Sequence, residues 1–260
     1  MTNHNTLNGY RQILEYQRDH SKYQCVKVYP AEEITIDNKG HVLAYGTTKE
    51  IRPGLTLEET LDQIKKQNGL SCAAHPFAVS NGIREKAVTC DLIESFNSNN
   101  IDVFSNIASS NFSEKNKMNN IAGSDSHVAC TIGRSINTVE SENNLDSILS
   151  NMHKGKFRID KADYASESEL YELAHYIISS SNKLLTAYIL ENYHPVIHYA
   201  AKLALNSFSS HPCNRFWRTI AAFTFYLTKR ASEKINMKGH NPVMFQQRSW
   251  RRLISLALIP

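Results

Sequence analysis

The sequence predicts an α/β fold over residues 1–163, followed by an all-α region over residues 164–260. Short apolar runs alternate with helical periodicity in the first part, which favours a layered sheet or a barrel with parallel strands. Helical patterns follow one another in the second part, with few strand signals. Histidines and carboxylates recur beside the predicted strands, where the functional residues of such folds collect.

Five strands are predicted before the helical region. They cover residues 23–36, 41–46, 70–77, 91–97 and 119–127. The turn sequence DNKG separates the first two strands. Thr56 as N-cap, Glu59 three positions later and Gly69 beyond the last turn together predict an amphipathic helix. A further helix is predicted over residues 143–157 and closes the first region.

Three helical patterns make up the second region, over residues 166–193, 194–208 and 214–235. Two interpretations remain open for its aromatic and basic side chains. They form a docking face for nucleic acid or an anionic membrane, or they belong to an appendage that packs against the first region, which is the simpler interpretation. These side chains are Trp217, Phe223, Phe225, Tyr226, Lys229, Arg230, Arg248, Arg251 and Arg252.

Composition sets broad limits on function. The 260 residues suffice for one large domain or a domain with an appendage, and a net charge of +4 does not by itself indicate a nucleic-acid partner. The polar start and the lack of an apolar run near ~20 residues predict a cytoplasmic protein without a transmembrane segment. The scattered cysteines predict reduced thiols. They are Cys25, Cys72, Cys90, Cys130 and Cys213.

The segment AGSDSH places Asp125 two residues before His127 in a glycine-flanked stretch. Alone, it is equally typical of a surface turn. Other histidines and carboxylates, however, are also predicted near strand ends, with Glu33 and His75 ending strands and His41 beginning one. A mixed nitrogen and oxygen donor set favours Zn²⁺, Mn²⁺ or Fe²⁺ over Ca²⁺. The candidate metal ligands are His4, Glu33, His41, His75, Asp125 and His127.

These segments resemble, in the same order, the motifs of the PHP (polymerase and histidinol phosphatase) family of metal-dependent phosphoesterases. TNHNTLNGY is similar to TDHNTLNGY, PAEEITI to Gly-x-Glu-x-Thr, and GHVLAYG to GHVLALG. AAHPF matches AHPF, DLIESFNS resembles IEVFN, AGSDSH matches GSDAH, and IGRSINTV matches what usually follows. The resemblance covers residues 1 to about 158 and implies a distorted (β/α) barrel.

Two departures from the family pattern concern the start of the chain. The family begins with an H-x-H motif on its first strand, which would lie upstream of Met1, and Asn3 stands where TDH has its aspartate. The resemblance therefore implies an N-terminally truncated, incomplete barrel that lacks its first strand.

Up to three divalent ions bind in the family, and the resemblance implies fewer here. Glu33, His41 and His75 would complete one centre, and Glu33 with Asp125 would leave a second centre without two imidazoles. His4 and His127 would leave the third centre one ligand short. Lost ligands lower metal affinity steeply, since losses even in the outer shell cost about 10–100-fold.

The implied activity is hydrolysis of a phosphomonoester or phosphodiester by a metal-activated water, with a small phosphorylated substrate or nucleotide as partner. An enzyme is expected if the H-x-H motif exists upstream. The alternative is a truncated, non-catalytic relative whose residual metal has a structural or regulatory role. Arg134 either holds a phosphate through its planar fork or forms a surface salt bridge. Nucleic acid lacks support as a partner, and the oligomeric state stays open.

Overall fold

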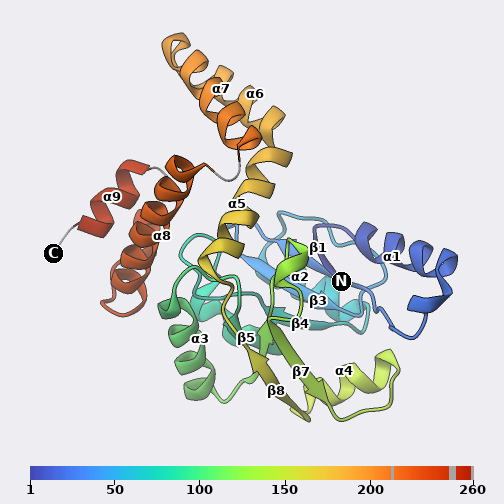
Figure 1. Ribbon diagram of the computed structural model, residues 1–260. Coiled ribbons are helices and arrows are strands. Elements are labelled where there is room, and N and C mark those ends of the chain that lie inside the picture. Colours follow the sequence, from blue (N-terminus) through green and yellow to red (C-terminus); the bar gives the residue numbers. More distant parts are fainter. Residues whose placement is uncertain (212–213, 246–249, 259–260) are drawn as a thin grey trace.

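The computed structural model describes residues 1–211, 214–245 and 250–258 and has the α/β fold with a helical C-terminal region that the sequence predicts (Figure 1). Six strands form one sheet in the order β1-β2-β3-β4-β5-β6, and β7 pairs with β8 separately. The strands are β1 (Thr2–His4), β2 (Ala31–Thr35), β3 (His41–Tyr45), β4 (Leu70–Ala73), β5 (Leu92–Asn97), β6 (Asn119–Gly123), β7 (Ser135–Val139) and β8 (Phe157–Ala162).

The large sheet is mixed. The pairs β1–β2, β4–β5 and β5–β6 are parallel, whereas β3 runs antiparallel to both β2 and β4. The expectation that all strands of this sheet are parallel is therefore wrong for β3. The connection from β2 to β3 is the short segment 36–40, and a parallel pair needs a crossover of a dozen residues or more. The barrel form stays a prediction.

The first predicted strand is much shorter than its apolar alternation indicates. Residues 24–30 lie outside any strand, and β2 begins directly after Pro30. Proline has no backbone N–H to donate to a sheet, so it typically stands at a strand's start or edge. Val26 belongs to the misleading alternation and is exposed.

Nine α-helices and four short 3₁₀ helices lie within the described ranges. The α-helices are α1 (Asn8–Asp19), α2 (Leu57–Lys66), α3 (Val103–Asn116), α4 (Leu145–His153), α5 (Glu167–Ser180), α6 (Asn182–Asn192), α7 (Pro195–Ser210), α8 (Arg215–Asn236) and α9 (Trp250–Leu258). The 3₁₀ helices are η1 (Ser21–Tyr23), η2 (Arg84–Thr89), η3 (Ala129–Thr131) and η4 (Pro242–Phe245). The predicted capping box of α2 is present, because Thr56 and Glu59 satisfy each other's backbone N–H groups.

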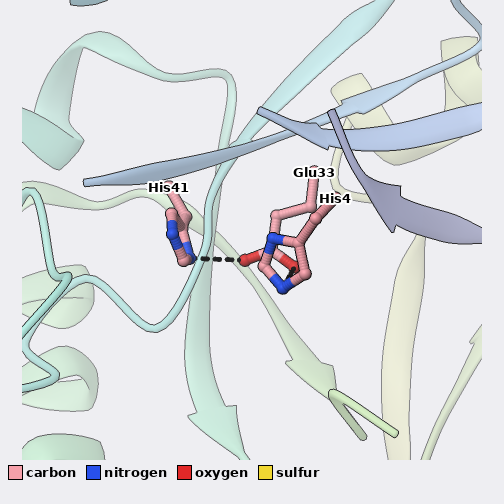
Figure 2. A group of neighbouring side chains, drawn as sticks. All are labelled: His4, Glu33 and His41. Carbon is pink, nitrogen blue, oxygen red and sulfur yellow. Dashed lines mark ion pairs between the residues drawn. The ribbon is translucent and has the colours of Figure 1, made fainter. Parts of the chain in front are cut away.

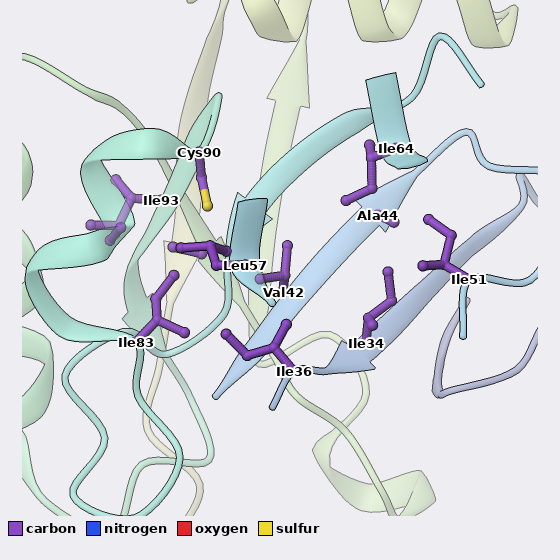
Figure 3. Close-up of a cluster of buried hydrophobic side chains, with 12 residues drawn as sticks. Ile34, Ile36, Val42, Ala44, Ile51, Leu57, Ile64, Ile83, Cys90 and Ile93 are labelled. Atoms are coloured by element: carbon purple, nitrogen blue, oxygen red, sulfur yellow. The ribbon is translucent and has the colours of Figure 1, made fainter. Parts of the chain in front are cut away.

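The main core lies on one face of the sheet, under α2 (Figure 3). Ile34, Val42 and Ala44 point into it together with Leu57 and Ile64 of the helix. Side chains alternate between the two faces of a strand, so the neighbours of these residues point to the opposite face. That opposite face carries the candidate metal ligands of β2 and β3.

The helical region is attached to the sheet region through α8. This helix packs against α3, and α9 packs against α8. Leu253, Leu256 and Ala257 of α9 are buried there with Leu227 and Ile235 of α8, so α8 covers the apolar side of α9. The packing interpretation fits this part of the region and Phe225 of α8, which is buried, whereas Phe223 and Tyr226 are exposed. Figure 1 shows α6 and α7 projecting away from the sheet.

Some predictions fall on residues outside the described ranges or are only partly tested. Cys213 and Arg248 lie outside these ranges. Cys25, Cys72, Cys90 and Cys130 are free thiols, as predicted. Among the described residues, no helix is long and apolar enough to span a membrane.

Candidate metal centre

Strand register brings three of the predicted ligands together. His4 of β1 lies directly beside Glu33 of β2, and His41 of β3 lies opposite Thr35, two positions from Glu33. Residues two apart share a face of a strand, so all three side chains point to the same side of the sheet. Figure 2 shows them converging. Glu33 lies in the middle of β2 and not at its end, which corrects the strand boundary predicted there.

Glu33 is the centre of the cluster. Its Oε1 lies 2.8 Å from Nδ1 of His41 and 3.3 Å from Nε2 of His75, and its Oε2 lies 3.5 Å from Nε2 of His4. Burial raises the pKa of the Glu33 carboxyl, but the hydrogen bonds with His41 and His75 outweigh burial and hold this pKa well below its usual range. The carboxylate is thus ionised although it is buried.

His75 follows β4 by two residues and has an unusual backbone conformation, with φ +28°. Its backbone N–H donates to Oε2 of Glu94, over 2.8 Å. Burial lowers the pKa of the His75 imidazole, whereas the Glu33 hydrogen bond and the charge of Asp125 raise it, to about 9. The imidazole therefore lies among the carboxylates of Glu33, Asp125 and Glu94.

Glu94 of β5 is a functional candidate that sequence reasoning missed. Its Oε2 also accepts a hydrogen bond from Asn97, and its Oε1 lies where a Cβ on Gly123 would come within 1.8 Å. Burial raises the pKa of this carboxyl to about 7. The available signal was the segment DLIESFN, because an acidic residue inside a buried strand needs a partner. Glu94 has one in the backbone of His75.

Asp125 and His127 form a more open part of the site, after the end of β6. Nδ1 of His127 lies 2.9 Å from the Asp125 carbonyl oxygen and 3.5 Å from its Oδ1. The His127 ring lies beside that of His4, with 5.7 Å between centroids. Asp125 has φ +45°, in the left-handed region. All six predicted ligands therefore lie in one neighbourhood, while their role as ligands stays a prediction.

Arg134 forms an ion pair with Glu169 of α5, through both Nε and Nη2. This contact matches the salt-bridge interpretation, and the phosphate-binding role stays a prediction. The side chain of Glu169 is largely buried, and that of Arg134 is about a third exposed.

The donor set fits a divalent transition metal. One ligand atom from each of His4, Glu33 and His41 lies within 4.8 Å of the other two. Nδ1 of His41 and Nε2 of His75 lie 3.4 Å apart, and both face the same Glu33 oxygen. Imidazole nitrogens around a carboxylate are the ligands that Zn²⁺ and Mn²⁺ accept.

Comparison with known proteins supports the resemblance of part of this chain to the PHP family. Residues 105–157 match the family model described as PHP-associated, which confirms the PHP resemblance for that part of the chain. The chain is also 30% identical over 112 residues to the uncharacterized protein MJ1587 of Methanocaldococcus jannaschii. That match covers 42% of this chain and 63% of the relative, so the chain spans less than two thirds of the relative's length.

Proposed function

We propose that this chain is a metal-dependent phosphoesterase that hydrolyses a small phosphomonoester or phosphodiester. The observation that carries the proposal is the convergence of His4, His41 and His75 on the two oxygens of one buried carboxylate, that of Glu33. The PHP-associated match supports the same conclusion independently of the geometry.

The two oxygens of Glu33 face different partners, which suits a carboxylate shared between two cations. Oε1 faces His41 and His75, and Oε2 faces His4. His41 and His75 with Oε1 of Glu33 would hold one ion, and His4 with Oε2, Asp125 and His127 would hold another. Zn²⁺, Mn²⁺ and Fe²⁺ are the candidates. A divalent ion bound there supplies Lewis-acid polarisation of water and of phosphoryl oxygens.

The chain's own side chains define how a substrate would reach the site. The side chains of His4 and His127 are 42% and 31% exposed, whereas those of Glu33 and His75 are 6% exposed. A phosphorylated substrate would therefore approach from the side of His4 and His127. The buried side holds the ligands in place.

One observation favours a second candidate, a PHP relative that keeps a structural or regulatory metal without catalysis. Asn3 stands where the resembled motif has an aspartate, and its Oδ1 is buried without a hydrogen-bond partner. The amide replaces a charged residue immediately before His4 in the sequence, although its side chain lies on the opposite face of β1, beside Gly9. A division of the chain at residue 163 into a metal-binding and a helical domain is part of both proposals.

The two candidates are separated by measuring metal content and hydrolysis on the same preparation. We expect purified protein to retain Zn, Mn or Fe by elemental analysis and to release p-nitrophenol from mono- or bis-(p-nitrophenyl) phosphate when Mn²⁺ is added. His75→Ala should lower both. Bound metal without hydrolysis would support the second candidate, and no bound metal in the wild-type chain would contradict both.

A further inference from the structure

The loop that carries His75 is closed by a precise set of backbone contacts. The carbonyl oxygen of His75 accepts from the N–H of Ala78, and that of Pro76 accepts from the N–H of Arg84, both over 2.8 Å. Gly82 packs so closely that a Cβ there would lie 2.2 Å from the Pro76 oxygen. Consecutive polar groups of this loop are therefore satisfied locally, as buried backbone requires.

The carbonyl of Phe77 is the exception, because its partner comes from the C-terminal helical region. Nδ2 of Asn236, the last residue of α8, donates to this oxygen over 3.1 Å. Phe77 is buried, and its position is two residues from His75. A side chain 159 positions further along the chain thus completes the hydrogen bonding of the candidate metal loop.

The orientation of the Asn236 amide is set by its other contacts. Its Oδ1 accepts from Nη2 of Arg84 over 3.0 Å, which directs the amino group towards Phe77. The Arg84 guanidinium in turn lies over the Phe77 ring, 5.1 Å from its centroid. An arginine can only donate, so the oxygen of the amide must face it.

The end of α8 is held in place by a buried polar anchor on α3. Ser232, one turn before Asn236, donates to Oδ1 of Asp102, and the same oxygen accepts from the N–H of Ser105. Val79 of the loop packs among the apolar side chains of α8 and α9. The helix, its anchor and the loop therefore form one packed unit.

We propose that Asn236 is a positioning residue for the candidate metal centre. Through the Phe77 carbonyl it fixes the loop that presents His75, so α8 determines how well the imidazole meets Glu33. The C-terminal helical region then helps to position a ligand of the metal site and is not only an appendage. This inference rests on the proposed metal-binding function.

The test is metal affinity of full-length variants, with Mn²⁺ and Zn²⁺ as probes in titration calorimetry. Asn236→Asp keeps an acceptor for Arg84 but removes the amino group that donates to Phe77 and to two serine hydroxyls. Asn241→Asp is the matched control, because it makes the same chemical change at an exposed position beyond α8 and keeps the oxygen that accepts from Val243. We expect Asn236→Asp to bind metal at least about tenfold more weakly, and Asn241→Asp to stay within about twofold of wild type.

Wild-type affinity in Asn236→Asp, or equal losses in both variants, would overturn the positioning role and leave the proposed metal site intact. No metal binding by the wild-type chain would overturn the proposed function together with this inference. If the new carboxylate prevents folding, Asn236→Ala, which introduces no charge, replaces it under the same criteria.

Discussion

The candidate metal centre has an inner and an outer half that differ in burial and in pairing. In the inner half, Glu33, His41 and His75 have side chains 6–13% exposed and contacts of 2.8–3.3 Å to the shared carboxylate. In the outer half, Asp125 and His127 are 19% and 31% exposed, and their side-chain contact is 3.5 Å. His4 lies between the two halves.

The difference indicates that the two halves are held by different means. The inner half is supported by β2, β3 and the loop after β4. Nδ1 of His75 is buried without a hydrogen-bond partner, whereas the Glu33 carboxylate pairs with both His41 and His75. A buried carboxylate is tolerated only when it is paired in this way. The outer half follows β6 and is closer to solvent. We therefore expect substitutions in the inner half to cost more metal affinity than those in the outer half.

The largest effect is expected for Glu33→Gln, which neutralises the residue that contacts three histidines. Metal affinity should fall by at least about 100-fold, because a shared ligand is lost and outer-shell losses alone reach that range. Glu58→Gln, on the exposed face of α2, is the control with the same chemical change. Calorimetric titration with Mn²⁺ measures the affinity of both variants. Equal affinities would contradict the proposed role of Glu33 at the centre of the inner half.

A second prediction concerns the support of the inner half. Gly123→Ala would place a Cβ 1.8 Å from Oε1 of Glu94 and force that carboxylate away from the His75 backbone. Overpacking of this kind costs about 1–3 kcal/mol. Chemical denaturation should show that loss, with weaker metal binding beside it. Unchanged stability and affinity would mean that Glu94 does not hold the loop.

A smaller effect is expected for His127→Ala in the outer half. Its imidazole is partly exposed, so water can take its place, and metal affinity should fall by about tenfold while unfolding stability stays within about 0.5 kcal/mol of wild type. Titration and thermal unfolding on the same sample measure both. A loss as large as that of Glu33→Gln would contradict the proposed difference between the halves.

The smallest effect is a pH dependence near the outer half. The Arg134 guanidinium, followed by the Ser166 backbone and hydroxyl, lowers the pKa of Glu169 to about 2, below its usual 4.5. A depressed carboxyl pKa stabilises the fold above the usual value, and this stabilisation is lost as pH falls from about 4.5 to about 2.

The size of this effect is modest because the ion pair is partly exposed. We expect about 1 kcal/mol, measured as the difference in acid unfolding between wild type and Glu169→Gln. Parallel stability curves of the two proteins across this pH range would show that the pair does not stabilise the native state.

Much of the site was predictable from the sequence because its candidate ligands lie in recognisable motifs. The residues that hold these ligands in place were not predictable. His75 and Asp125 stand out as polar residues after apolar strands. Glu94 is less visible, because only the fold shows that its carboxylate meets the backbone of His75. Asn236 lies 159 positions from its partner Phe77, and no local pattern reports such a contact.

The fold shows the same division between local and long-range information. The capping box of α2 was predictable because Thr56 and Glu59 are neighbours. Helix α3 was not predicted, since polar side chains such as Ser105, Asn106 and Ser109 form its buried face and leave no apolar stripe. The antiparallel placement of β3 depends on turn length and pairing partners, which alternation alone does not specify.

The central claim is that Glu33, His41 and His75 together bind a divalent ion. Anomalous diffraction from crystals of the chain soaked in Mn²⁺ or Zn²⁺ tests it most directly. The account predicts an anomalous peak in contact with all three side chains. Crystals that show no peak there, or a peak bound only by residues elsewhere, would contradict it.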